Sequence, residues 1–128
     1  MRVLRSDLTA MGEAREYVRG RLGEAFEAST LWDVELLTSE LVSNAVKHVG
    51  NGKGTIGLEI DIRPDAVRVS VTDEGGGFTP MPRESDQEIG GWGLFLVETV
   101  SDRWGILDRP FTVWFELDRS SGSGTEQP

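Results

Sequence analysis

The stretch ELVSNAVKH, Glu40 to His48, places polar side chains at a regular interval within an apolar helix pattern. Glu40, Asn44 and His48 recur every fourth residue, and side chains at this spacing lie on one face of a helix. The polar row runs along the edge of a broad apolar arc made by Leu31, Val34, Leu41, Val42, Ala45, Val46 and Val49. The row is therefore either a solvated helix edge or one wall of a site beside the core.

Helical periodicity extends on both sides of this stretch. Apolar residues at three- and four-residue steps predict a helix from Leu8 to Phe26, and a second helix from Leu31 to about Val49. Thr30 is the candidate N-cap of the second helix, and Asp33 is placed in its first turn, where the helix dipole favours an anion. A third helix is predicted from Leu94 to Trp104.

Alternating apolar residues predict antiparallel strands with one buried face. Two of them, Ile56 to Ile62 and Val67 to Val71, flank the turn signal Pro64-Asp65. A short strand around Trp104 to Leu107 and a final strand from Phe111 to Leu117 follow. Helices and strands are segregated along the chain, which predicts an α+β fold.

Composition predicts one domain and limits its partners. We expect residues 1–118 to form the domain and residues 119–128, a Ser- and Gly-rich stretch, to be a disordered tail. A net charge of −9 disfavours general binding to nucleic acid or to anionic membranes. The absence of cysteine excludes thiolate metal sites, and no signal peptide or membrane span is evident. We therefore expect a soluble protein of the cytoplasm.

Asp73 stands where an alternating strand runs into three glycines, in VTDEGGGF. A carboxylate held at a strand end accepts a hydrogen bond from the amino group of adenine and repels the carbonyl oxygen of guanine. The alternative is an ordinary Asp-Gly turn. The sequence from Asp73 to Gly93 has little apolar periodicity and predicts a mobile loop.

The stretch GGWGLFLV, Gly90 to Val97, leads glycines into an apolar helix. Backbone N–H groups at such a helix start can hold phosphates, which makes Gly91, Trp92 and Gly93 candidates. The stretch GNGKGT does not fit a Walker loop, because Gly54 separates Lys53 from Thr55.

Taken together, the three stretches resemble the motifs of the Bergerat-fold ATPases of the GHKL superfamily, which includes gyrase, the large heat-shock chaperones, histidine kinases and MutL. ELVSNAVKH is similar to their N box, DEGGGF to the first glycine box and GGWGLFLV to the second. The short chain and the ending RWG through TVWFEL are most similar to the bacterial anti-sigma factor serine kinases. The resemblance covers Arg15 to Leu117 and implies a two-layer α/β sandwich with a mixed, mostly antiparallel sheet and helices on one face.

The resemblance also implies roles for individual residues. Glu40 matches the catalytic carboxylate, expected to be a general base; Asn44 matches the Mg²⁺ ligand, and Asp73 the adenine-reading carboxylate. The other expected nucleotide contacts are Lys47, His48, Gly75, Gly77, Phe78, Gly91, Trp92, Gly93, Leu94 and Thr112, the last being a strand threonine that supports the adenine. For His48, a structural role and a ligand contact both remain open.

The implied function is that of an ATP- and Mg²⁺-dependent serine/threonine kinase that binds a sigma factor or phosphorylates a serine on an anti-sigma antagonist. The same resemblance suggests a homodimer. One departure bears on catalysis: Gln87, Glu88 and Ile89 stand where such kinases often carry a basic residue. One alternative is therefore a partner-binding module that uses nucleotide only to set its conformation. A detached histidine-kinase ATP-binding domain is a third reading.

Overall fold

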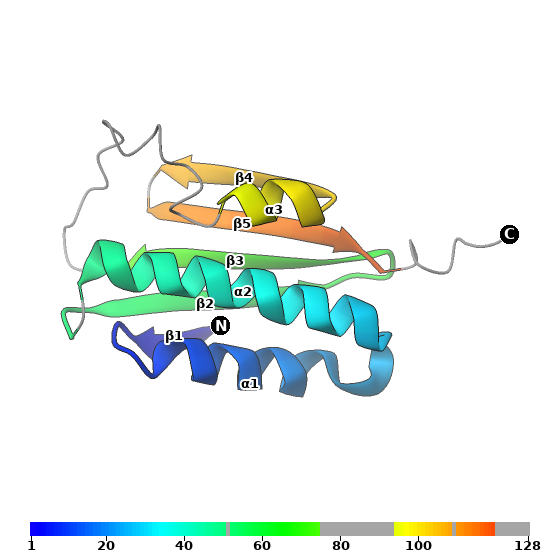
Figure 1. Cartoon of the computed structure of the whole chain (residues 1–128), viewed down its shortest axis with the longest axis horizontal. Helices are drawn as coiled ribbons and strands as arrows, with labels where there is room; N and C mark the ends of the chain where they lie inside the picture. Colours follow the sequence, from blue (N-terminus) through cyan, green and yellow to red (C-terminus); the bar gives the residue numbers. More distant parts are fainter. Residues whose placement is uncertain (51, 75–93, 109, 120–128) are drawn as a thin grey trace, which may run out of the picture.

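A computed structural model describes residues 1–50, 52–74, 94–108 and 110–119, which form an antiparallel sheet with helices on one side (Figure 1). The sheet order is β1-β2-β3-β5-β4, and all four pairings are antiparallel. The strands are β1 (Arg2–Arg5), β2 (Thr55–Ile62), β3 (Ala66–Glu74), β4 (Arg103–Asp108) and β5 (Phe111–Asp118). The predicted α+β class is confirmed, and we find no parallel pair among these strands where a mixed sheet was expected.

The helices are α1 (Ala10–Leu22), which continues into a 3-10 turn (Gly23–Ala25), α2 (Ala28–Val49) and α3 (Leu94–Val100). They lie on one face of the sheet, so the molecule has two layers and the other sheet face is not covered by any described helix (Figure 1). None of the described helices is both long enough and apolar enough to cross a membrane.

The core lies between the two layers because helix and strand periods turn their apolar residues toward one another. Ala14, Val18 and Leu22 on α1 and Val34, Leu37 and Val42 on α2 are buried against Leu58, Val69 and Phe115 of the sheet. The apolar faces predicted from the sequence therefore form one continuous core.

The pairing of β3 with β5 determines which side chains face the helices. Val71 is paired with Val113, and Thr72 with Thr112. Because successive residues of a strand point to opposite faces, the two valines face the helix layer and the two threonines face the uncovered side. This alternation decides the composition of the site described below.

The start of α2 differs from the prediction. The helix begins at Ala28, where Leu31 N–H donates to Glu27 O, so Thr30 lies inside the first turn. Glu27 occupies the N-cap position with an extended backbone, and its side chain makes no capping hydrogen bond. The prediction of Thr30 as the N-cap is therefore wrong, and Asp33 lies beyond the first turn. Gly50 ends the helix as expected, with a φ of 107°.

The third helix is shorter than its apolar period suggested. It ends at Val100, where both the backbone N–H and the hydroxyl of Ser101 donate to Val97 O. Asp102 N–H then donates to Glu116 O, which brings the chain into the sheet. Trp104 consequently belongs to β4, the short strand that was also predicted.

The N- and C-terminal regions add two features that the sequence reading did not contain. The strand β1 was missed because Leu4 is its single buried residue, which leaves no alternation to recognise. Arg119, assigned to the tail, contacts the domain: its guanidinium carbon lies 4.1 Å from the Phe26 ring centroid. The predicted mobile loop beyond Glu74 and the rest of the tail lie outside the described residues.

Candidate functional site

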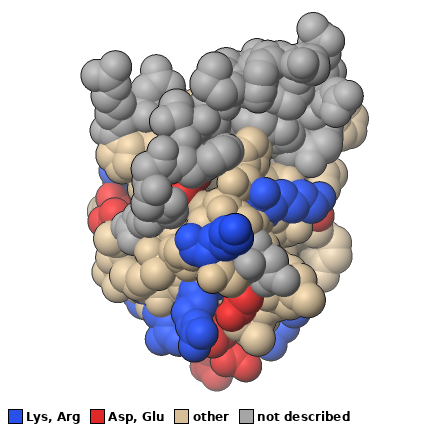
Figure 2. Space-filling model, turned by 90° about the vertical axis from the view of Figure 1, so that its left-hand side faces the viewer, with Lys and Arg blue, Asp and Glu red and all other residues tan. Residues whose placement is uncertain are grey.

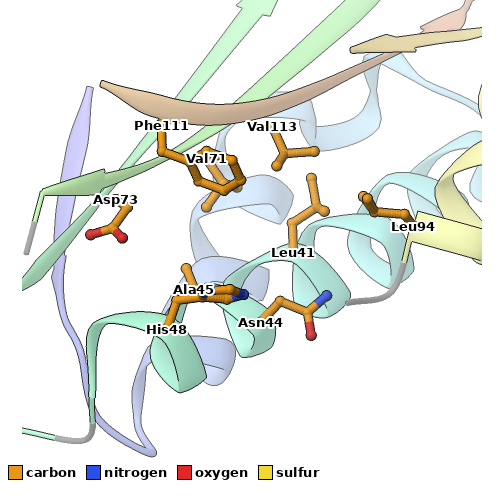
Figure 3. A pocket seen from close by; sticks show the side chains of 9 residues that line it. All are labelled: Leu41, Asn44, Ala45, His48, Val71, Asp73, Leu94, Phe111 and Val113. Carbon is orange, nitrogen blue, oxygen red and sulfur yellow. The ribbon is translucent and has the colours of Figure 1, made fainter. Parts of the chain in front are cut away.

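A pocket opens between the C-terminal half of α2 and the strands β3 and β5 (Figure 3). Its lining combines an apolar floor with a few polar groups: Leu41, Asn44, Ala45, His48, Val71, Asp73, Leu94, Phe111 and Val113. The cavity measures about 20 Å³, which is space for about one water molecule. A ligand of ordinary size must therefore displace side chains to enter.

One face of α2 supplies the helix side of the pocket. Leu41, Asn44, Ala45 and His48 follow the spacing of residues that lie on one helix face. Asn44 is 8% exposed, and its Nδ2 has no hydrogen-bond partner among the described residues. An unpaired buried amide costs stability, so its presence at a pocket wall points to a ligand that pairs with it.

The sheet supplies the opposite wall. Asp73 lies near the end of β3, where it is paired with Ile56 of β2, and its carboxylate lines the pocket. Phe111 and Val113 of β5 stand beside it on the same sheet face (Figure 3). A carboxylate thus faces the pocket at one end, and the Asn44 amide lies toward the other.

Two aromatic rings from the opposite walls approach each other in the pocket. The ring centroids of His48 and Phe111 are 6.3 Å apart, with an angle of 34° between the ring planes. Sequence reasoning missed Phe111, because it reads as the first apolar member of an alternating strand. Its position opposite the polar row of α2 follows from the register between β3 and β5, and the local sequence carries no signal of it.

The structure brings together four of the predicted site residues: Asn44, His48, Asp73 and Leu94. Glu40 lies one turn before Asn44 on α2, is half-buried, and is not among the lining residues named above. Lys47 is exposed. The predicted contacts that lie outside the described residues are Gly75, Gly77, Phe78, Gly91, Trp92 and Gly93.

Thr112 does not join this group. Its hydroxyl donates to Pro110 O at 3.0 Å and lies 3.0 Å from the Thr72 hydroxyl, on the uncovered face of the sheet. Since the donor capacity of Thr112 is used by Pro110 O, Thr72 is the donor in the pair. The strand pleat therefore points Thr112 away from the pocket, and Phe111 and Val113 into it.

The end of the molecule where α2 stops and β2 begins carries basic side chains despite the net charge of −9 (Figure 2). Basic side chains gather across the middle of this face. Lys47 in the last turn of α2, Lys53 in the turn before β2, and Arg5 at the end of β1 are all exposed. An anionic ligand entering from this end meets a locally favourable field.

The donor set suits a metal held jointly with a ligand. Within the described ranges, no three His, Cys, Asp or Glu side chains gather closely enough to hold a metal ion. Mg²⁺ needs few protein ligands when it bridges phosphates, and it takes amide oxygens. The side chain of Asn44 carries one such oxygen and lines the pocket, so it is the described residue that fits this requirement.

Comparison with known proteins gives a consistent result. A family model described as Histidine kinase-like ATPase domain matches residues 4–113. A serine-protein kinase RsbW from Listeria innocua is 33% identical over 99 residues, covering 66% of this chain and 62% of the relative. A serine-protein kinase RsbW from Staphylococcus aureus is 31% identical over 93 residues, covering 61% of this chain and 58% of the relative. The chain thus spans about three fifths of the length of these curated relatives.

Proposed function

Because the chain belongs to the histidine kinase-like ATPase domain family, we propose that it binds ATP with Mg²⁺ and acts as a regulatory serine/threonine kinase of the anti-sigma factor type. One observation carries the nucleotide site: Asn44 and Asp73, predicted as metal ligand and base reader, lie on opposite walls of one pocket. Similarity to serine-protein kinases supports the phosphoryl-transfer part.

In this proposal each wall of the pocket has its own task. Asp73 accepts a hydrogen bond from the amino group of adenine. The amide oxygen of Asn44 would hold Mg²⁺, and the metal would supply neutralisation of the phosphate charge. The backbone of Gly75, Gly77, Gly91, Trp92 and Gly93 shapes the pocket and holds the phosphates, while Lys47, Phe78 and Leu94 complete the nucleotide contacts.

Glu40 is the proposed general base. It lies one turn from Asn44 on α2, so its carboxylate would be on the phosphate side of a nucleotide whose base contacts Asp73. It would accept the proton of a serine hydroxyl as that oxygen bonds to the terminal phosphorus of ATP, while the bond from this phosphorus to the β-phosphate oxygen breaks and ADP leaves. The serine belongs to a protein partner, an anti-sigma antagonist, and the second partner is a sigma factor. The proposal includes a location in the cytoplasm, where such partners would act.

A second candidate function is a partner-binding module that responds to nucleotide without transferring phosphate. Two observations favour it: Glu40 is not among the side chains that line the pocket, and Gln87, Glu88 and Ile89 provide no basic residue before Gly90. In this case ATP changes the partner-binding surface, and the chemistry at Glu40 is dispensable.

Calorimetry with ATP and Mg²⁺ tests the nucleotide site. Micromolar affinity, equivalent to about −8 kcal/mol, is expected for the unmodified chain. Asn44→Ala should remove the dependence of ATP affinity on Mg²⁺. Asp73→Asn should weaken the binding of ATP but not that of guanine nucleotides. Ser43→Ala, beside Asn44 but outside the lining set, is the matched control. Absence of binding, or binding unaffected by both substitutions, would reject the site.

Transfer of labelled phosphate from ATP to a co-purified partner separates the two functions. The kinase proposal expects transfer that Glu40→Ala reduces by about two or more orders of magnitude without weakening ATP binding. Glu59→Ala, an exposed acid on β2, should transfer normally. If the complex responds to ATP while phosphate never moves, the binding module is the correct function.

A further inference from the structure

Ser6 is a buried serine at the junction between β1 and α1. It is 0% exposed, and its three polar groups all form hydrogen bonds with the glycine turn (Gly50, Gly52 and Gly54) that links α2 to β2. The hydroxyl donates to Gly50 O at 2.9 Å, the backbone N–H donates to Gly54 O at 2.8 Å, and the backbone O accepts from Gly52 N–H at 2.5 Å. Ser6 is therefore bonded to both ends of a turn that begins 44 positions further along the chain.

The glycine turn connects the two walls of the pocket. His48, on the helix wall, lies two residues before Gly50, the residue that ends α2 (Figure 3). On the sheet side, Gly54 leads directly into β2, the strand that is paired with Asp73 of the opposite wall. The end of α2 therefore cannot move away from the sheet unless the turn changes its conformation or loses its hydrogen bonds to Ser6.

The glycine turn has little stiffness of its own. Gly50 and Gly52 have φ values of 107° and 80°, which glycine adopts readily and other residues rarely. Glycine also has the greatest conformational freedom of any residue, so this backbone can rearrange once its hydrogen bonds are broken. Lys53 N–H donates to Gly50 O, but this bond lies within the turn. The hydrogen bonds to Ser6 are therefore what holds the turn against the end of β1.

The pocket in this structure is closed to a nucleotide. A cavity of about 20 Å³ has space for about one water molecule, so a larger ligand needs the lining residues to move. The glycine turn lies at the end of the molecule where Lys47, Lys53 and Arg5 are exposed, which is the end that attracts an anionic ligand (Figure 2). The bonds to Ser6 thus act where the two walls are joined and where such a ligand enters.

We propose that Ser6 and the glycine turn form a latch that keeps the pocket closed, and that nucleotide binding releases it. The inference rests on the proposed function, because the ligand is ATP. In the open state the end of α2 moves away from the sheet, and the bonds from the Ser6 hydroxyl to Gly50 and from Gly52 to Ser6 are broken. Because the ligand binds the open state, the latch lowers the apparent affinity in proportion to the fraction of molecules that are open.

Ser6→Ala removes a bond of the closed state and should therefore tighten the binding of ATP with Mg²⁺. One net hydrogen bond corresponds to roughly two- to tenfold in an equilibrium constant. The dissociation constant should fall by about this factor, through a faster association rate measured by stopped-flow mixing. Ser101→Ala, which removes a hydroxyl that donates to Val97 O at the end of α3, is the matched control and should leave binding unchanged. A serine with a purely structural role would leave the affinity unchanged or weaken it, and either result would overturn the latch.

Hydrogen exchange in the unmodified chain tests the latch without a substitution. The Gly52 amide donates to Ser6 O, so it should exchange by local opening, faster than the core amide of Val69 and with little dependence on low concentrations of urea. ATP with Mg²⁺ should slow exchange at Val69, because the ligand stabilises the fold. It should speed exchange at Gly52, because the bound state is unlatched. Exchange of Gly52 only together with Val69, or slower exchange at Gly52 upon binding, would contradict the inference.

The outcomes separate the latch from the function on which it rests. If ATP binds, but Ser6→Ala does not tighten it and Gly52 becomes more protected, the latch is wrong and the proposed function stands. If ATP does not bind, while Gly52 opens locally and opens more often in Ser6→Ala, the latch is supported and the proposed function fails. If ATP does not bind and Gly52 exchanges only with the core, both proposals fail.

Discussion

Asn44 shows a conflict between stability and function at a single residue. It is nearly fully buried in a helix that otherwise turns apolar residues toward the core, and its Nδ2 has no hydrogen-bond partner among the described residues. An unsatisfied buried amide costs about 1–3 kcal/mol. A fold selected for stability alone would place an apolar residue there, and the proposed nucleotide site offers a reason for the amide.

Asn44→Leu should therefore abolish Mg²⁺-dependent ATP binding without destabilising the free protein. We expect the free energy of unfolding to be unchanged or to rise by up to about 1 kcal/mol, because an unpaired amide is replaced by an apolar side chain of similar size. Urea unfolding with and without ATP and Mg²⁺ measures both effects. A loss of more than about 2 kcal/mol in the absence of ligand would mean that the amide has a structural partner.

Asp33 gives a pH-dependent contribution to stability. Partial burial raises the pKa of its carboxyl. The folded state therefore holds the proton at higher pH than the unfolded state, and stability falls as pH rises from the unfolded pKa through the raised folded pKa. At neutral pH, and at every pH above the folded pKa, the charged carboxylate lowers the free energy of unfolding.

Asp33→Asn should accordingly raise the melting temperature at pH 7. The gain in free energy of unfolding should be less than about 1 kcal/mol, since the side chain is only partly desolvated. It should disappear near about pH 3, where the carboxyl is protonated in both states. Thermal melts across this pH range measure the difference, with Glu59→Gln as an exposed acidic control. A gain that persists at low pH would contradict burial as the cause.

At the scale of elements, β4 and β5 are held together by close packing on the uncovered face of the sheet. Gly105 of β4 is paired with Trp114 of β5, and the indole lies directly over the glycine. The guanidinium carbon of Arg68, from β3, lies 3.9 Å from the centroid of the indole. The glycine is required because the indole occupies the space of a side chain.

Gly105→Ala should destabilise the protein. A Cβ added at Gly105 would lie 2.8 Å from indole atoms of Trp114, so the ring must move away from Arg68, at a cost of about 1–3 kcal/mol. Gly20→Ala in α1 is the matched control: its Cβ would meet no atom within 4 Å, and helix propensity predicts a gain of about 0.5–1 kcal/mol. Chemical unfolding of both variants measures the change in the free energy of unfolding, which should be a decrease for Gly105→Ala and an increase for Gly20→Ala. Equal effects would show that the indole does not restrict Gly105.

The elements differ in how far the sequence predicts them. Those with a long apolar period, such as α2 and β5, were predicted with errors only at their ends. The strand β1 was missed because four residues with one buried side chain carry no period. The polar row of α2 predicted Asn44 and His48 in the pocket. Phe111 could not be distinguished from a core residue, because its role depends on the register between β3 and β5, which local sequence does not encode.

At the scale of the whole molecule, Glu116 connects three parts of the chain on the uncovered sheet face. The side chain is buried at 8% exposure and accepts from Arg63, which follows β2, from Arg68 on β3 and from Arg103 on β4, at 3.4, 3.3 and 2.6 Å. The two atoms joined by each distance are a guanidinium nitrogen and a carboxylate oxygen. Glu116 is the carboxylate that these three arginines share, while Asp61 also pairs with Arg63 and Asp118 with Arg103.

Glu116→Gln should lower the free energy of unfolding by about 1–3 kcal/mol. Glutamine keeps the shape but removes the charge that the three guanidinium groups share; the loss stays below that of a fully buried ion pair because the arginines are partly exposed. Urea unfolding at low and high salt tests this, and Glu59→Gln is the control without these arginine partners. If high salt destabilises the unmodified protein no more than the variant, repulsion between the arginines does not explain the loss of stability on Glu116→Gln.

The central place of β5 has a consequence for the order of folding. This strand comes last among the described elements, yet it lies between β3 and β4, and β4 is paired with no other described strand. Its contacts with β3 join residues about 40 positions apart in sequence, and contacts of this kind form slowly because a long loop must close first. Since Phe111 and Val113 belong to the pocket wall, the pocket is completed only when this last strand has inserted. During refolding, helix signals should therefore recover before affinity for nucleotide does.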